Sequence, residues 1–246
     1  MKLSVVVTID KHSQGVNPHG VNNTLSALAR QTFTDFEVLL VSDNDSTQPQ
    51  KPEDALQQHI DSLNLRHISL SDLNDLSTWP LMTLLEQTAH DYIVFMHGDS
   101  IPRWDFLASH QRRAKAGTYL AGRYYFVPKV ASQSFKPEDV LWGRCFDFLW
   151  LRQQGLPATA TRSGISSGGL AARFTDLLLP VKYQPECCHL SGWKSDLISD
   201  IERQAGKASS TAHPQNDVPA VHQQLSGCGL KLTRLQHSAV CLQLND

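Results

Sequence analysis

The feature that most constrains this chain is an apolar run that stops at a glycine and a carboxylate. Residues 91–100 read Asp-Tyr-Ile-Val-Phe-Met-His-Gly-Asp-Ser, and their apolar positions do not alternate with polar ones. Such a run is typical of a strand buried on both faces of an open α/β sheet. Ligands of these sheets bind beyond the carboxyl ends of the strands, which makes Gly98 and Asp99 candidate site residues. The same two residues also suit a plain turn before Pro102.

Two further runs of the same character, at residues 4–9 and 36–42, lie upstream. Between them, apolar residues at helical spacing predict a helix that ends near residue 31 and is capped by Asn22 or Asn23. Strand, helix and strand in this order predict a parallel βαβ unit. Additional strands are predicted over 66–70 and 118–127, and additional helices over 53–63, 76–88, 104–116, 176–179 and 195–204.

The composition excludes several classes of protein. The chain is 41% hydrophobic and 19% charged, with a formal charge of -2, so neither disorder nor a nucleic-acid-binding surface is expected. No apolar segment approaches the roughly 20 residues that cross a bilayer, so we expect no transmembrane segment and a cytoplasmic protein. The five cysteines show no disulfide or zinc spacing and are expected to be free thiols.

Polar residues follow three of the predicted strands. Thr8 and Asp10 end the first strand, Asp43 follows the second, and Asp99 follows the third. Parallel strands would bring these ends to one edge of the sheet, where several carboxylates suit a cationic or metal-bridged ligand. The first loop contains neither the Gly-x-Gly-x-x-Gly fingerprint of dinucleotide-binding folds nor a Walker motif, so hydride transfer and P-loop chemistry are disfavoured.

The sequence resembles the family 2 glycosyltransferases of the GT-A fold. The most specific stretch is Gln-Thr-Phe-Thr-Asp-Phe-Glu at residues 31–37, and the run ending at Asp99 is similar to the strand that ends in the family's Asp-x-Asp motif. Residues 167–173 are similar to the acceptor-side loop, and residues 191–197 to the Gly-aromatic stretch before the acidic catalytic segment. The resemblance implies an α/β GT-A fold, with a Rossmann-like open mixed, mostly parallel sheet flanked by helices. It also implies one domain over residues 1–246, with a nucleotide-sugar half at 1–117 and an acceptor half at 118–246.

The activity that the resemblance implies is that of a hexosyltransferase in polysaccharide biosynthesis. Such an enzyme moves a sugar from a nucleotide-diphosphate donor, with a UDP-sugar as the first expectation, to a hydroxyl of a glycan or lipid-linked acceptor. The transfer usually inverts the anomeric carbon and uses Mn²⁺ or Mg²⁺. Carried over position by position, Thr8, Asp10 and Gly98 would line the donor pocket, and Asp43 would hydrogen-bond the base.

The metal ligands and the general base also follow from the resemblance. Asp99 matches the second acid of Asp-x-Asp, whereas His97 stands in place of the first and is either a ligand or an ordinary strand-end histidine. His222 is either a third ligand or a surface histidine. Asp196 would remove the proton of the acceptor hydroxyl. Asp200 lies four residues later on the same helical face and is the reserve base.

Two other functions compete with this one. A catalytically silent module could keep the nucleotide pocket without the metal or the base, and a nucleotidyltransferase could share the α/β architecture. The second is disfavoured because no Gly-rich, Lys-bearing loop follows the first strand. The aromatic segment 142–150 either docks a lipid-linked acceptor at the inner face of the membrane or packs in the core or a homodimer interface.

Overall fold

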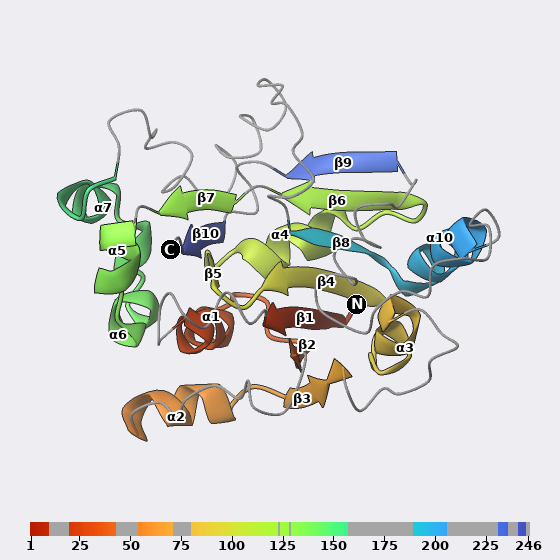
Figure 1. The fold of residues 1–246 in the computed structure, drawn as a ribbon, viewed down its shortest axis with the longest axis horizontal. Helices are drawn as coiled ribbons and strands as arrows, with labels where there is room; N and C mark the ends of the chain where they lie inside the picture. The colour runs from red at the N-terminus through yellow and green to blue at the C-terminus, as the bar shows by residue number, and fades with distance from the viewer. Residues whose placement is uncertain are drawn as a thin grey trace.

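An open sheet of mixed direction dominates the fold. The computed structural model describes residues 1–9, 20–42, 54–70, 80–122, 124–127, 129–156, 189–205, 231–235 and 241–244 (Figure 1). Within these ranges, seven strands follow the order β3-β2-β1-β4-β8-β6-β9, and three short strands form a second sheet in the order β5-β10-β7.

The main sheet is parallel except for one strand. Its members are β1 (Leu3–Ile9), β2 (Phe36–Ser42), β3 (Leu65–Ser69), β4 (Tyr92–His97), β6 (Thr118–Gly122), β8 (Leu190–Trp193) and β9 (Lys231–Leu235). β8 runs antiparallel to both β4 and β6, while the other neighbours pair in parallel. The second sheet contains β5 (Ser100–Pro102), β7 (Tyr124–Val127) and β10 (Cys241–Leu244).

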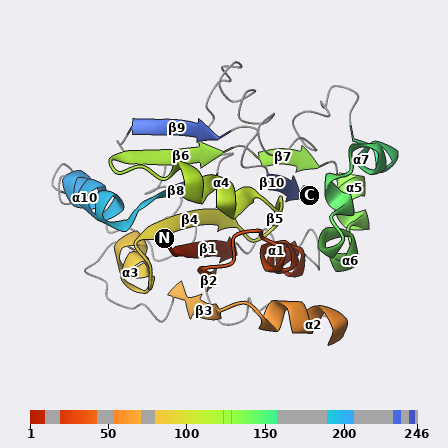
Figure 2. The ribbon, with the colours of Figure 1, turned by 180° about the vertical axis from the view of Figure 1, so that it is seen from behind.

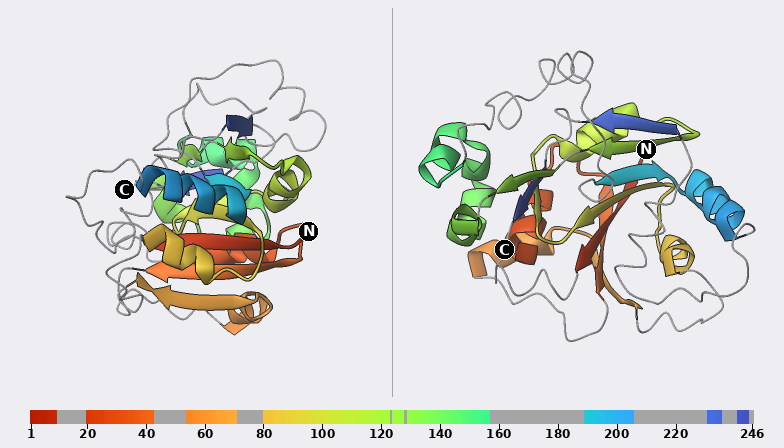
Figure 3. Two further views of the ribbon diagram at one scale, coloured as in Figure 1. Left: turned by 90° about the vertical axis from the view of Figure 1, so that its right-hand side faces the viewer. Right: turned by 45° about the horizontal axis from the view of Figure 1, so that its top comes forward.

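Helices cover both faces of the main sheet. They are α1 (Gly20–Ala29), α2 (Asp54–Asp61), α3 (Pro80–Glu86), α4 (Phe106–Arg113), α5 (Lys129–Ser134), α6 (Pro137–Leu141), the 3-10 helix η3 (Arg144–Phe146), α7 (Phe148–Gln153) and α10 (Lys194–Ala205). α1, α2 and α4 pack on one face, and α3 and α10 pack on the other. Figure 2 shows α4 across the back of the sheet, and Figure 3 shows the layers from the side and with the top of the molecule tilted towards the viewer. None of the helices in the described ranges is long and apolar enough to cross a bilayer.

This architecture confirms the predicted fold class and corrects three of its elements. The strand predicted over 118–127 is two strands, because β7 leaves the main sheet and pairs with β10. The helix predicted over 104–116 ends at Arg113. Asn22 and Asn23 do not cap α1, because the helix begins at Gly20 and buries both residues.

The aromatic segment 142–150 contributes to a third core cluster around α5, α6 and α7. Phe146 is buried in this cluster, and Phe148 and Trp150 pack against it. Trp142 and Leu149 instead remain 73% and 66% exposed. Only part of the apolar surface of this segment is therefore buried in the core.

A buried polar chain runs between β4, β8 and α4. The Tyr92 hydroxyl lies 2.8 Å from Ser191 Oγ, which lies 2.6 Å from His110 Nδ1. His110 Nε2 lies 3.0 Å from His189 Nδ1, and both imidazoles are fully buried. Burial, together with the neighbouring His189, lowers the pKa of His110 well below its ordinary value of 6.5.

We expect His110 to make the fold sensitive to acid. The unfolded chain binds a proton at this imidazole below pH 6.5, whereas the folded chain resists doing so, so stability is complete above that pH and falls as the pH is lowered. Denaturant unfolding of the wild type and of His110→Gln at a series of pH values tests this. The wild type should lose stability more steeply than the variant, with the exposed His59→Gln as control. Equal slopes in all three proteins would contradict the assignment.

Candidate functional site

The carboxyl ends of β1 and β4 lie side by side and are joined by backbone. Thr8 and His97 are register partners, and the Gly98 amide donates to the Thr8 carbonyl at 2.8 Å. A Cβ at Gly98 would lie 3.2 Å from that carbonyl and 3.3 Å from Ile9 Cγ1. Glycine is therefore needed here because the two backbones approach each other closely. The turn that carries Asp99 is therefore fixed close to the end of β1.

The amino-terminal part of α1 also contacts the turn that carries Gly98 and Asp99. Thr24 Oγ1 lies 2.7 Å from the Gly98 carbonyl, 2.8 Å from the Ser100 carbonyl and 3.2 Å from the Gly20 carbonyl of its own helix. Its single proton lies closest to the two carbonyls of the turn. A Cβ at Gly20 would lie 3.8 Å from both Cα and Cβ of Asp99. Asp99 is thus placed at the positive end of α1, which favours negative charge. We call Thr8, Thr24, His97, Gly98 and Asp99 the strand-end site.

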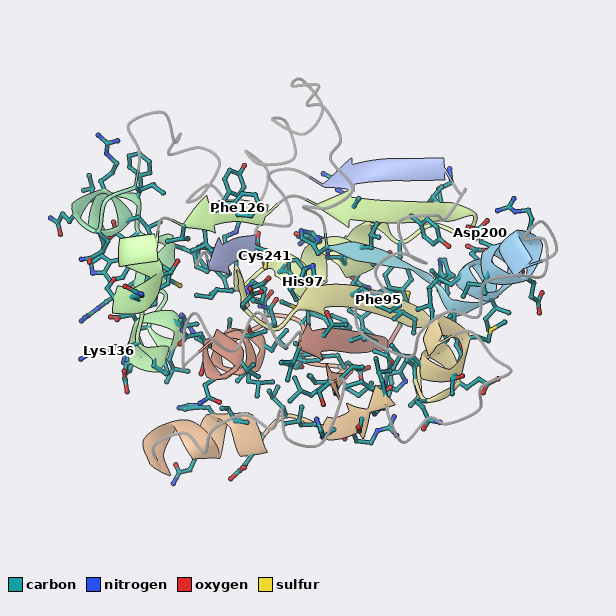
Figure 4. All side chains as sticks on the ribbon, viewed as in Figure 1. Phe95, His97, Phe126, Lys136, Asp200 and Cys241 are labelled. Carbon is teal, nitrogen blue, oxygen red and sulfur yellow. The ribbon has the colours of Figure 1, made fainter. Side chains whose placement is uncertain are left out.

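The carboxyl-terminal strand borders the strand-end site. β10 pairs antiparallel with β5, and Cys241 opposes Pro102. Burial, followed by the negative charge of Asp99, raises the pKa of the Cys241 thiol well above its ordinary value. The thiol is therefore un-ionised and lies close to the carboxylate. Figure 4 shows His97 at the arrowhead of β4, with Cys241 on the neighbouring second sheet.

The side chains of the strand-end site suit a divalent cation that also binds phosphate. Asp99 offers a carboxylate and His97 an imidazole, and both are half-buried. Among the described residues, no group of three or more His, Cys, Asp or Glu side chains could hold a metal by itself. Mg²⁺ in particular is usually held by one or two carboxylates together with the phosphates of a substrate, so these residues fit such a cation.

Asp196 and Asp200 do not join this site. β8 runs antiparallel to β4, and Trp193 at its end opposes Tyr92, the first residue of β4. α10 therefore starts at the amino edge of the sheet, about 20 Å away across the six residues of β4. There, Asp196 Oδ2 accepts the Gly117 amide at 2.6 Å, and Asp200 forms an ion pair with Arg203 (Figure 4).

The structure therefore does not bring Asp196 or Asp200 together with Asp99, beside which the family resemblance predicts a general base. The physical reason is the reversed direction of β8, which carries the acidic segment away from the strand-end site. Of the other expected site residues, the structure brings Thr8, His97, Gly98 and Asp99 together. The remaining three lie outside the described residues: Asp10, Asp43 and His222.

Thr24 and Cys241 were not expected near the site. Thr24 stands in a stretch whose asparagines suggested only a helix cap, and its contact with the turn depends on where α1 begins. The spacing of four residues from Gly20 is the one sequence signal that could have placed both residues on the same helical face. Cys241 gives no such signal, because its neighbours in β5 lie about 140 residues earlier in the chain.

Comparisons with known proteins agree with the family resemblance. The model of the family described as Glycosyl transferase family 2 matches residues 7–172, about two thirds of the chain. No curated protein gives a significant match. The observed sheet, mostly parallel with helices on both faces, agrees with the expected GT-A fold.

Solved structures of one bacterial protein also resemble the chain. The crystal structure of S. aureus TarS 1-349 has 15% identity and a TM-score of 0.48, covering 99% of this chain and 60% of that one. Its complex with UDP has 15% identity and a TM-score of 0.49, covering 100% and 61%. The chain thus spans about 60% of the length of these structures.

We expect Thr24→Val to destabilise the fold by about 1–3 kcal/mol, because two buried carbonyls lose the hydroxyl that they share. Denaturant unfolding measures this loss. Ser26→Ala is the matched control, since Ser26 is equally buried on α1 but bonds the Asn22 carbonyl of its own helix at 2.7 Å. We expect the control variant to lose less free energy of unfolding than Thr24→Val. Equal losses would show that the hydroxyl of Thr24 does not fasten the turn.

Proposed function

Because the chain belongs to glycosyl transferase family 2, we propose that it transfers a sugar from a nucleotide-diphosphate donor, bound at the strand-end site, to an acceptor hydroxyl. The observation that carries this proposal is the position of Asp99. Its turn follows the central strand β4 and is held by Thr8 of β1 and Thr24 of α1. A carboxylate so fixed beside the positive end of a helix suits recognition of a metal-bridged diphosphate.

Asp99 and His97 are the described residues that would hold the cation, which we propose to be Mn²⁺ or Mg²⁺. The carboxylate is a hard oxygen ligand, and the imidazole accommodates Mn²⁺ better than Mg²⁺. When bound, the cation would neutralise negative charge on the leaving nucleotide diphosphate. The residues of the turn keep both side chains at the end of β4, so the donor meets a preformed site.

For the remaining details we keep the expectations drawn from the family. The donor is proposed to be a UDP-sugar carrying a hexose, and the acceptor a glycan or a lipid-linked glycoconjugate. Attack of the acceptor hydroxyl opposite the departing diphosphate would invert the anomeric carbon in a single step. The base for that step is not assigned to Asp196 or Asp200, since both lie at the other edge of the sheet.

One observation favours a second candidate function, a nucleotide-sugar-binding module without transferase activity. Both carboxylates that resembled the catalytic base make structural contacts at the amino edge, with Gly117 and Arg203. A silent module would bind the donor in the same place. It would release neither free sugar nor glycosylated product from that donor.

Release of nucleotide by the purified chain distinguishes the two functions. UDP-, GDP-, CMP- and dTDP-sugars are incubated with and without Mn²⁺, and binding is followed in parallel by thermal shift. Hydrolysis or transfer with one donor supports the enzyme. Binding without turnover, across donors and a panel of glycan acceptors, supports the silent module. The absence of both binding and turnover would contradict the proposal.

We expect Asp99→Asn to lower metal-dependent turnover by about 100-fold or more, because the charge stabilisation that a cation supplies is worth several kcal/mol. The isosteric amide should leave the melting temperature close to that of the wild type. Asp91→Asn is the matched control, since Asp91 is exposed and precedes the same strand at its other end. Unchanged turnover in Asp99→Asn would remove this carboxylate from the site.

Asp196→Asn should retain most of the turnover, because the amide oxygen can still accept the Gly117 amide and the residue lies far from Asp99. Initial rates with the identified donor test this, with the melting temperature as a check on folding. Loss of turnover in a variant that melts like the wild type would return the role of base to Asp196. It would also contradict the position of α10 at the amino edge.

A further inference from the structure

The first turn of α1 carries a buried amide that the protein does not satisfy. Asn23 is fully buried, and neither its side-chain nitrogen nor its side-chain oxygen has a hydrogen-bond partner among the residues that the structure describes. A buried amide without partners is unfavourable by itself, and such a group in a native fold calls for an explanation. Helix capping does not supply one, because α1 begins at Gly20.

Asn23 lies between the strand-end site and the third core cluster. It follows Gly20, the residue of α1 that faces Asp99, by about 4.5 Å along the helix axis. Its neighbour Thr24 bonds the turn itself. One turn later on the same face, Ala27 packs in the cluster that contains Leu242 of β10. Asn23 is therefore a buried amide on the part of α1 that contacts the Asp99 turn.

Gln31, a buried amide just after this helix, shows how the fold bonds such a group when its role is structural. Gln31 Nε2 donates to the Arg103 carbonyl at 2.9 Å and to the Ala27 carbonyl at 3.1 Å. Its Oε1 accepts the Leu107 amide at 3.0 Å. Gln31 therefore ties the end of α1 to the start of α4. The Asn23 amide, by contrast, has no hydrogen-bond partner among the described residues.

We propose that Asn23 binds a hydroxyl of the donor's sugar, an inference that rests on the proposed function. Both atoms of the amide are available, and an alcohol can accept from Nδ2 while donating to Oδ1. A phosphate oxygen can only accept, so the diphosphate would satisfy half of the amide. Asn23 is fully buried, so the sugar must move neighbouring groups aside to reach it.

The test compares sugar nucleotides with the corresponding free nucleotides. Isothermal titration measures binding of UDP, UDP-glucose, GDP and GDP-mannose, each with Mn²⁺, to the wild type, Asn23→Leu and the smaller Asn23→Ala. We expect both variants to bind the free nucleotides like the wild type and to lose about tenfold or more in affinity for the sugar nucleotide. Equal affinity of variant and wild type for the sugar nucleotide would overturn the proposal.

Melting temperatures provide the second readout. Asn23→Leu replaces an unsatisfied amide with an apolar side chain of similar size, so its melting temperature should equal or exceed that of the wild type. Gln31→Leu makes the same change at a satisfied amide and should melt lower. A fall in Asn23→Leu as large as that in Gln31→Leu would show a structural partner and overturn the proposal. Failure of the proposed function is seen separately, as absence of nucleotide binding by the wild type.

Discussion

The parallel pairing of β1 with β4 is the constraint on which the rest of the structure depends. Every residue of β1 is buried, and the strand is bonded on both sides, to β2 and to β4. Parallel partners with a fixed register must end at the same edge of the sheet. Thr8 and His97 therefore meet, and the next amide, that of Gly98, reaches back to the Thr8 carbonyl. The site is thus a consequence of how the core strands are aligned.

Buried polar groups form hydrogen bonds that connect this sheet to segments distant in the sequence. Glu37 of β2 accepts hydrogen bonds from Ser4 at 2.5 Å and from the Ala89 amide at 2.6 Å, and it pairs with Arg66 of β3. One carboxylate thereby joins β1, β2, β3 and the segment that precedes β4. Because each of these groups would be costly to bury alone, the bonds specify which segments meet. The apolar core supplies the burial, and the polar contacts select the arrangement.

The inner strands could be predicted from sequence because their signal is local. The largely apolar runs at 4–9, 36–42 and 92–97 are buried on both faces. A run of this kind predicts a buried strand whichever neighbouring strands it pairs with. β5 and β10 could not be predicted, since three or four residues carry little pattern and their pairing joins positions about 140 residues apart. The division of 118–127 between two sheets has the same origin.

The residues of the candidate site also differ in how far the sequence could predict their positions. Gly98 and Asp99 follow from the chemistry of a strand end, which sequence displays directly. The position of Asp196 depends on the direction of β8, and a motif specifies residue types without specifying whether the strand before them runs parallel or antiparallel. Helix α1, which contacts the site, has some features that the sequence predicts and others that depend on the tertiary fold. Its apolar stripe is visible in the sequence, whereas its polar contacts depend on β4 and β5. Asn23, on the same helix, has no such contact among the described residues, and it is this difference from Thr24 on which our proposal of a ligand for Asn23 rests.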